Sequence, residues 1–147
     1  MGSMGQRLHE YPLTIVERHL DTFGHVNNAT YLEIFEEARW DWITRAGFGL
    51  DEVRRLQQGP TILECRIAFR RELRQRTQAV VLTEALDYVG KTGRLRQTLA
   101  RVDTGQVACE AEFVVGLFDL TRRRLIAPTP EWLAVVGMTQ QYREKPE

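Results

Sequence analysis

The spacing of apolar and polar residues changes along this chain. It predicts a helix in one segment and strands in another. Between Tyr31 and Ala46 apolar residues recur three and four positions apart, which is typical of one face of an amphipathic helix. Gly47 and Gly49 follow this stripe and are expected to end the helix. From Thr61 onward the period becomes two, as expected of strands with one buried face.

The alternating segments predict an antiparallel sheet. We expect strands over Tyr11–Val16, Thr61–Arg70, Ala79–Tyr88, Arg94–Val102 and Val107–Leu117. Gly90-Lys91-Thr92-Gly93 is a hairpin signal between two of these strands, and Trp132–Val136 is a short apolar segment near the end. One strand, a helix and then four closely spaced strands favour an α+β fold, with the helix on one face of an antiparallel sheet.

Two signals compete for the start of the helix. Asn27 or Asn28 would serve as the N-cap, whereas Thr30 with Glu33 forms a capping box. We favour the asparagines because the apolar stripe already includes Tyr31.

Length and composition indicate one globular domain over residues 5–147, with residues 1–4 interpreted as an expression scar. The 147 residues include 20 basic and 20 acidic side chains, and this balance argues against a nucleic-acid-binding protein. Neither a membrane-spanning run nor a signal sequence is present. The two cysteines, Cys65 and Cys109, make neither a disulfide framework nor a zinc site, and both are expected to be buried and free. We therefore expect a cytoplasmic protein.

One helix cannot cover both faces of the expected sheet. The helix stripe is also unusually aromatic for a lone surface helix. Unless the second face is polar, another copy of the chain must cover it, and we expect a homo-oligomer.

The densest group of reactive polar side chains is the segment from Asp21 to Asn28, just before the helix. A helix N-terminus offers unpaired backbone N–H groups and a positive dipole end, which suit an oxyanion. Gly24 allows a sharp turn, and Asp21 could act there as a base or a nucleophile. These are the parts needed for acyl transfer.

The pattern Asp-x-x-Gly-His-Val-Asn-Asn-x-x-Tyr, from Asp21 to Tyr31, continues to Glu36-Glu37-Ala38-Arg39-Trp40. It resembles the hotdog-fold acyl-CoA thioesterases of the 4-hydroxybenzoyl-CoA thioesterase group. Within that group it is most similar to bacterial long-chain acyl-CoA thioesterases associated with β-oxidation. A weaker likeness extends over most of Tyr11–Pro130.

This resemblance implies a five-stranded antiparallel sheet wrapped around one long central helix, in dimers or dimers of dimers. It also implies an active site at the subunit interface, an acyl-CoA substrate of medium to long chain, and no metal or other cofactor. The catalytic carboxylate falls on Asp21 and the backbone N–H that binds the oxyanion on Asn28. Gly24, His25, Asn27, Tyr31 and Lys91 are candidates for substrate binding or for shaping the site.

Several of these residues also have simpler interpretations. Asp21 could form an Asx-turn, Asn27 and Asn28 could be plain caps, and Tyr31 could pack along the helix stripe. His19 stands where many relatives carry a second aspartate, and it would alter the pH dependence if it faced the site.

Other charged residues extend the list of candidates. Glu36 and Arg39 have the spacing of an ion pair. The phosphates of CoA could be bound by arginines near the strand ends or by the hairpin lysine, namely Arg70, Arg71, Arg74, Arg76, Lys91 and Arg122–Arg124.

Two other functions remain open. A hotdog hydratase or dehydratase would use a histidine and a carboxylate, for which His25 and Glu36 are available, but its motifs differ from those here. The third hypothesis is a protein that binds acyl-CoA without turnover, against which the intact motif argues.

Overall fold

The computed structural model describes residues 8–146, so residues 1–4, interpreted above as a scar, lie outside the described residues. The strands are β1 (His9–Thr14), β2 (Gln58–Phe69), β3 (Gln78–Val89), β4 (Thr92–Arg101), β5 (Val107–Asp119) and β6 (Arg124–Ile126). The helices are α1 (Asn28–Arg45), α2 (Leu50–Leu56), α3 (Pro130–Val135) and a single 3₁₀ turn η1 (Glu17–His19).

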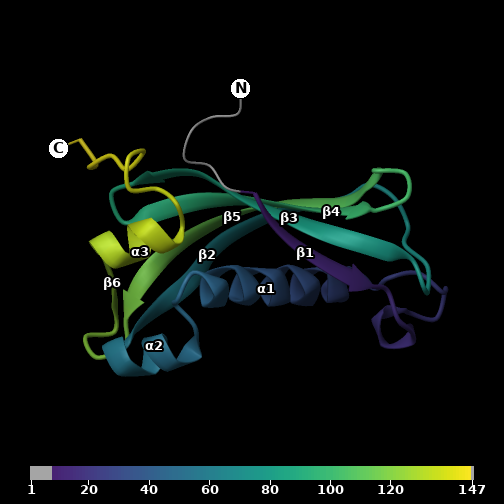
Figure 1. The fold of residues 1–147 in the computed structure, drawn as a ribbon, viewed down its shortest axis with the longest axis horizontal. Coiled ribbons are helices and arrows are strands. Elements are labelled where there is room, and N and C mark those ends of the chain that lie inside the picture. The colour runs from purple at the N-terminus through teal and green to yellow at the C-terminus, as the bar shows by residue number, and fades with distance from the viewer. Residues whose placement is uncertain (1–7, 147) are drawn as a thin grey trace.

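All strand pairs are antiparallel, in the order β1-β3-β4-β5-β2, and α1 lies across one face of the sheet (Figure 1). The expected α+β architecture is confirmed. The expected count of five strands and one helix is wrong, because β6 pairs with the end of β5 and two short helices, α2 and α3, are also present. The strand β6 is only three residues long, too short for its period to show in the sequence.

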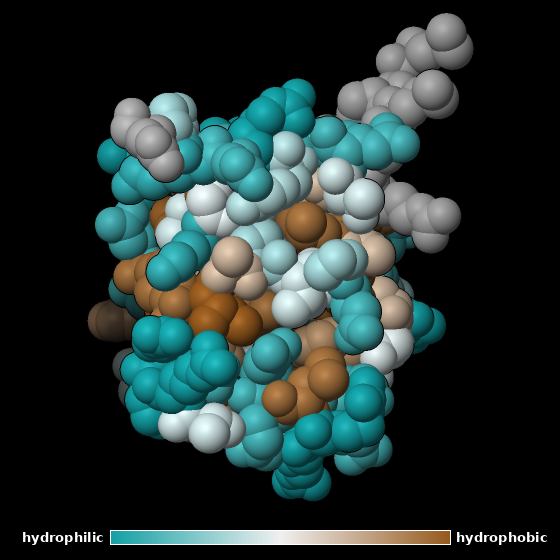
Figure 2. Space-filling model, turned by 90° about the vertical axis from the view of Figure 1, so that its left-hand side faces the viewer, coloured by the Kyte–Doolittle hydropathy of each residue, from teal (hydrophilic) through white to brown (hydrophobic). Residues whose placement is uncertain are grey.

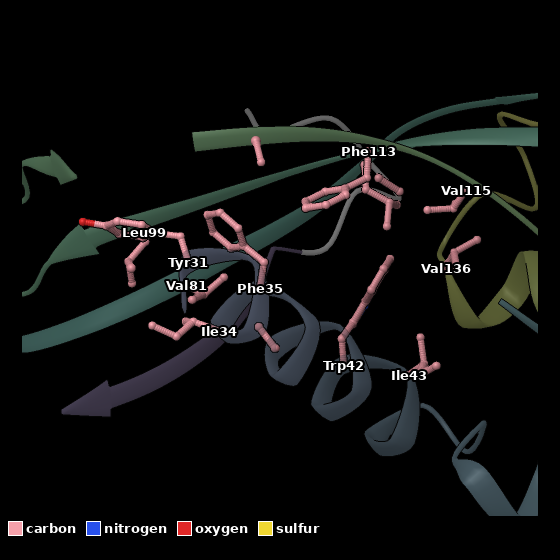
Figure 3. Close-up of a cluster of buried hydrophobic side chains, with 14 of the residues drawn as sticks. Tyr31, Ile34, Phe35, Trp42, Ile43, Val81, Leu99, Phe113, Val115 and Val136 are labelled. Atoms are coloured by element: carbon pink, nitrogen blue, oxygen red, sulfur yellow. The ribbon is translucent and has the colours of Figure 1, made fainter. Parts of the chain in front are cut away.

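The apolar stripe of α1 forms the centre of the core. Phe35 and Ala38 are completely buried, and the ring of Phe35 meets that of Phe113 from β5 edge-on, 6.1 Å between centroids. Figure 3 shows the side chains of α1 directed toward the sheet, with Trp42 and Ile43 near its C-terminal end. The helix ends at Arg45, and Gly47 two residues later has a φ of 91°, a left-handed conformation that favours glycine.

The two short helices differ in how well the sequence reveals them. The predicted apolar segment Trp132–Val136 overlaps α3, which begins at Pro130 and buries Trp132. The helix α2 has no buried residue, so it carries no apolar stripe that periodicity could detect.

The edge strand β2 departs from expectation in its burial. A strand forms there as predicted, but the expected half-burial is wrong: Ile62, Leu63, Cys65 and Phe69 are exposed, and the register shifts between Ile62 and Glu64. The prediction that Cys65 is buried is therefore wrong, because the single chain leaves both faces of the middle of β2 open to solvent. Cys109, on the interior strand β5, is buried as predicted.

Figure 2 views the end of the molecule that carries α2, α3 and β6, and hydrophobic surface is visible there between hydrophilic residues. The opposite end, where α1 begins, carries η1 and the turn that contains Asp21 (Figure 1). Within residues 8–146, no helix is long and apolar enough to cross a membrane.

Candidate functional site

A groove of about 290 Å³ opens at the N-terminal end of α1. Three segments form it: the turn before α1, the first turn of α1, and the end of β2 with the loop that follows. We call it the Asp21 groove, and its lining residues are Asp21, His25, Val26, Asn28, Tyr31, Phe69, Arg70, Arg71 and Glu72. The structure therefore brings four of the predicted site residues together: Asp21, His25, Asn28 and Tyr31.

Backbone hydrogen bonds fix the turn that carries Asp21. The Asp21 N–H donates to the His25 carbonyl at 2.9 Å, and the Gly24 N–H donates to the Asp21 carbonyl at 3.1 Å. Gly24 has a φ of 81°, a left-handed conformation that L side chains rarely adopt. Gly24 therefore shapes the turn and does not line the groove.

Only one oxygen of the Asp21 carboxylate accepts hydrogen bonds from the described residues. Its Oδ1 accepts hydrogen bonds from the backbone N–H of Phe23 at 2.9 Å and, more weakly, of His25 at 3.4 Å. The proposed Asx-turn is thus present. Within residues 8–146 the second oxygen, Oδ2, has no hydrogen-bond partner, so the turn aligns the carboxylate without using both of its oxygens.

The N-terminus of α1 keeps its backbone donors free. Asn27 is the N-cap, as predicted from the asparagines, but its side chain makes no capping hydrogen bond. The Asn27 N–H donates to the His19 carbonyl at 3.0 Å, and the Thr30 N–H to the Asn27 carbonyl at 2.9 Å. The N–H groups of Asn28 and Ala29 have no acceptor in the described part of the chain. Two donors at the positive end of the helix therefore remain available.

His25 is paired with a residue that the sequence did not suggest. Its Nε2 lies 3.0 Å from Oε2 of Glu72, in the loop after β2. Glu72 is 62% exposed and His25 is 29% exposed, so this pair sits at the mouth of the groove. The only hint in the sequence is that Glu72 is the single acid within the arginine-rich segment 70–76.

Tyr31 contributes a neutral hydroxyl to the groove. Its ring is buried against Phe69, with centroids 5.5 Å apart. Burial is the main cause that raises the pKa of Tyr31 to about 12, and Cys109, Glu72 and Asp21 add to it. No residue among those described accepts a hydrogen bond from this hydroxyl, so it can donate to a ligand. Tyr31 thus both packs along the helix stripe, as predicted, and lines the groove.

Lys91 lies away from the groove. It sits on the hairpin between β3 and β4, whereas β3 begins at Gln78, beside Thr14 and the groove end of the sheet. The groove is lined instead by Arg70 and Arg71. Within one chain the twelve-residue strand β3 separates Lys91 from the Asp21 groove, and a role for Lys91 in binding substrate stays a prediction.

His19 does not line the groove either. It is buried below the turn, and its Nδ1 accepts a hydrogen bond from the Val16 N–H at 2.9 Å. Burial, followed by the charge of Arg18, lowers the pKa of His19. The residue therefore supports the segment before Asp21.

The predicted ion pair between Glu36 and Arg39 is not formed. Arg39 Nη1 donates instead to Gln97 Oε1 at 2.9 Å, and its guanidinium stacks over the ring of Phe113. Glu36 lines a second, separate pocket together with Arg39. It is not part of the Asp21 groove, so His25 and Glu36 do not form the hydratase pair considered above.

Among residues 8–146 no group of three or more histidine, cysteine or acidic side chains is placed to hold a metal ion. The chemistry that the Asp21 groove can perform rests on a carboxylate, free backbone N–H groups, a neutral hydroxyl and two arginines.

Comparison with known proteins supports a hydrolytic role. Residues 17–136 match the model of the thioesterase-like superfamily. The chain is 29% identical over 118 residues to the long-chain acyl-CoA thioesterase FadM of Escherichia coli strain K12, covering 74% of this chain and 82% of that protein.

Solved structures agree with the family match. A probable thioesterase from Escherichia coli, 26% identical, superposes with a TM-score of 0.78 over 90% of this chain and 98% of its own. A hypothetical protein of Staphylococcus aureus in complex with CoA has the same fold, with 22% identity and a TM-score of 0.84 over 100% of this chain and 91% of its own. With the family model spanning the groove and most of the sheet, the chain belongs to the thioesterase-like superfamily and is a thioester hydrolase.

Proposed function

We propose that the protein hydrolyses acyl-CoA thioesters to a free acid and CoA, with Asp21 as base or nucleophile. One observation carries this proposal: Asp21 Oδ2 and the Asn28 N–H lie in the same groove, and neither has a hydrogen-bond partner among residues 8–146. A thioester carbonyl bound between them has a donor on its oxygen and a carboxylate beside its carbon.

The reaction balances with water as the only co-reactant. If Asp21 is the base, it takes a proton from water as the water oxygen bonds to the carbonyl carbon. If Asp21 is the nucleophile, its oxygen bonds to that carbon first and water then cleaves the anhydride. In both schemes the C–S bond breaks, CoA leaves as the thiol after protonation, and Asn28 N–H stabilises the oxyanion. Neither scheme needs a metal or other cofactor.

The substrate that we propose is a medium- to long-chain acyl-CoA. The relative FadM is named for long-chain acyl-CoA. In this chain α1 and β2 bound both the Asp21 groove and the second pocket beside Arg39. The helix rise places Arg39 about 16 Å beyond Asn28 along α1. An acyl chain lying between α1 and β2 would extend from one cavity to the other.

The phosphates of CoA would meet the mouth of the groove. Arg71 lines the groove, is exposed and makes no ion pair within residues 8–146, whereas Arg70 already pairs with Glu110 at 2.7 Å. We propose Arg71 as the first phosphate contact, because a free guanidinium matches the geometry of a phosphate.

We also propose that the chain works as a homo-oligomer, a dimer or a dimer of dimers. The strand β2 presents a free sheet edge, with Ile62, Leu63 and Phe69 exposed between 41% and 48%. A second copy covering this edge would bury these side chains. The free thiols of Cys65 and Cys109 suit a reducing cytoplasm, where we place the protein in fatty acid metabolism.

The test is a thiol-release assay on acyl-CoAs from acetyl to palmitoyl, with benzoyl-CoA added. Replacing Asp21 by asparagine should lower turnover at least about a hundredfold, the range for losing a general base. Asp119→Asn is the matched control, because Asp119 Oδ1 also accepts two backbone N–H groups, at the opposite end of the sheet.

Near-wild-type turnover in Asp21→Asn would contradict the assignment of Asp21. If the folded wild-type protein binds CoA but releases no thiol from any substrate, it is a binding protein without turnover.

A further inference from the structure

The second pocket, beside Arg39, places two charged side chains, those of Arg39 and Glu36, among apolar residues. Its volume is about 110 Å³, and its lining includes Trp42, Ile62, Val115 and Trp132 with Arg39 and Glu36. We call it the tail pocket. Arg39 is half-buried, and a charge that is partly withdrawn from water is usually paired with a carboxylate.

The position of Arg39 is fixed from behind by a buried amide. Gln97 is completely buried, and its Nε2 donates to the Phe35 carbonyl and to Thr83 Oγ1, both at 3.0 Å. These two bonds orient the amide so that Oε1 accepts from Arg39 Nη1 at 2.9 Å. The guanidinium carbon also stacks 4.4 Å from the centroid of the Phe113 ring. The guanidinium is therefore held in one orientation.

Most donors of this guanidinium remain unused. Arginine has five N–H groups, and Gln97 is the single hydrogen-bond acceptor that Arg39 has among residues 8–146. No buried side-chain nitrogen in that range lacks a partner, so the unused N–H groups are accessible to solvent, and Arg39 is one of the residues that line the tail pocket. Glu36 lies one turn earlier on α1, is exposed to solvent, lines the same pocket and adds an acceptor.

We propose that Arg39 and Glu36 bind a hydroxyl group near the far end of the acyl chain, so that the enzyme prefers hydroxylated acyl tails. This inference rests on the proposed function, because it assigns the substrate of that same site. The hydroxyl oxygen accepts from Arg39, and its hydrogen is donated to Glu36. The opposite charges of the two residues balance, so an uncharged polar group fits better than a carboxylate.

The length of the path sets where the hydroxyl should lie. Arg39 is about 16 Å beyond Asn28 along the helix axis. An extended polypeptide advances about 3.6 Å over the three backbone bonds of each residue. We therefore take an extended acyl chain to advance about 1.2 Å per bond. About a dozen bonds therefore separate the thioester from the hydroxyl, which fits ω-hydroxydodecanoyl-CoA.

The tryptophans allow binding of a fatty acid in the tail pocket to be measured without any catalytic turnover. All three tryptophans of the chain, Trp40, Trp42 and Trp132, line the tail pocket. Tryptophan fluorescence should therefore change when free dodecanoate, ω-hydroxydodecanoate or dodecanedioate is titrated into the intact protein. We expect ω-hydroxydodecanoate to bind about tenfold more tightly than dodecanoate, as for one hydrogen bond to a charged group.

Three variants separate the roles of the two charged residues. Arg39→Gln removes the guanidinium and should abolish the preference for the hydroxylated acid, and Arg39→Lys, which keeps a charge, should retain part of it. Glu36→Gln should raise the affinity for dodecanedioate relative to the hydroxylated acid. Ile62→Trp narrows the pocket from the exposed strand and should weaken both acids without removing a buried hydrogen bond.

Equal affinities of the wild-type protein for dodecanoate and ω-hydroxydodecanoate would overturn the proposal, even with normal thiol release. A tenfold preference without any thiol release would instead overturn the proposed function and leave the role of Arg39 intact. If Arg39→Gln weakens self-association in sedimentation but leaves the preference unchanged, Arg39 serves contact between copies, and the proposal is wrong.

Discussion

His25 and Glu72 meet at the mouth of the Asp21 groove, with 3.0 Å between Nε2 and Oε2. This contact joins the turn before α1 to the loop after β2, two segments nearly fifty residues apart in sequence. Because both side chains are partly exposed, we expect it to contribute less to folding stability than to the placement of the loop.

Replacing Glu72 by glutamine should therefore lower kcat/KM about three- to tenfold while the unfolding free energy changes by less than about 1 kcal/mol. Glu17→Gln is the matched control, because it removes a similarly exposed ion pair, with Arg76, outside the groove. Steady-state kinetics and urea unfolding measure both effects. Equal kinetic losses in the two variants would show that the contact with His25 has no special role.

Tyr31→Phe tests the neutral hydroxyl in the groove. Its pKa of about 12 keeps it protonated at all working pH values, so it can donate throughout. We expect kcat/KM to fall about tenfold, with unchanged stability, because no described residue accepts its hydrogen bond.

Tyr88→Phe should give the opposite result. The Tyr88 hydroxyl accepts from Trp132 Nε1 at 3.2 Å, and removing it leaves that buried N–H without an acceptor. Stability should fall by about 1–3 kcal/mol with little loss of activity. A stability loss in Tyr31→Phe would mean that its hydroxyl is structural.

The sequence predicts the fold well where burial follows a period. The stripe of α1 and the alternation of β3, β4 and β5 each place one face in the core, and those faces are buried in the structure. The pattern of β2 also predicts a strand, but periodicity cannot tell whether the same chain covers its apolar face.

The sequence predicts only some of the residues of the candidate site. Asp21, His25, Asn28 and Tyr31 are near one another in the chain, so one motif predicts their proximity. Residues 69–72 join them only through the pairing of β2 with β5, which periodicity does not specify. Lys91 shows the same limit, since a hairpin signal does not say at which end of the sheet the hairpin lies.

His19 should make stability depend on pH. Burial, then the charge of Arg18, lowers its folded-state pKa below the usual 6.5. The unfolded chain therefore binds the proton first as the pH falls. The stability contributed by neutral His19 is complete above about pH 6.5 and is lost as the pH falls through the folded-state pKa.

His19→Asn keeps an acceptor for the Val16 N–H and removes the titration. Urea unfolding from about pH 8 to about pH 5 should show a smaller loss of stability in this variant than in the wild type. Parallel pH profiles would mean that other groups control the acid response.

Gly24→Ala tests whether the shape of the turn matters for catalysis. Gly24 and Gly105 both have positive φ, 81° and 73°, and a Cβ at either position would meet nothing within 4 Å. Alanine at either position should therefore cost about 1–2 kcal/mol of unfolding free energy through backbone strain alone.

Gly24 lies within the turn that aligns the Asp21 carboxylate, whereas Gly105 lies in the exposed loop between β4 and β5. We expect only Gly24→Ala to lower kcat, by about tenfold or more, because small displacements of a catalytic group are costly. Equal kcat in the two variants, with matched losses of stability, would show that the turn tolerates distortion and that the alignment of Asp21 does not depend on it.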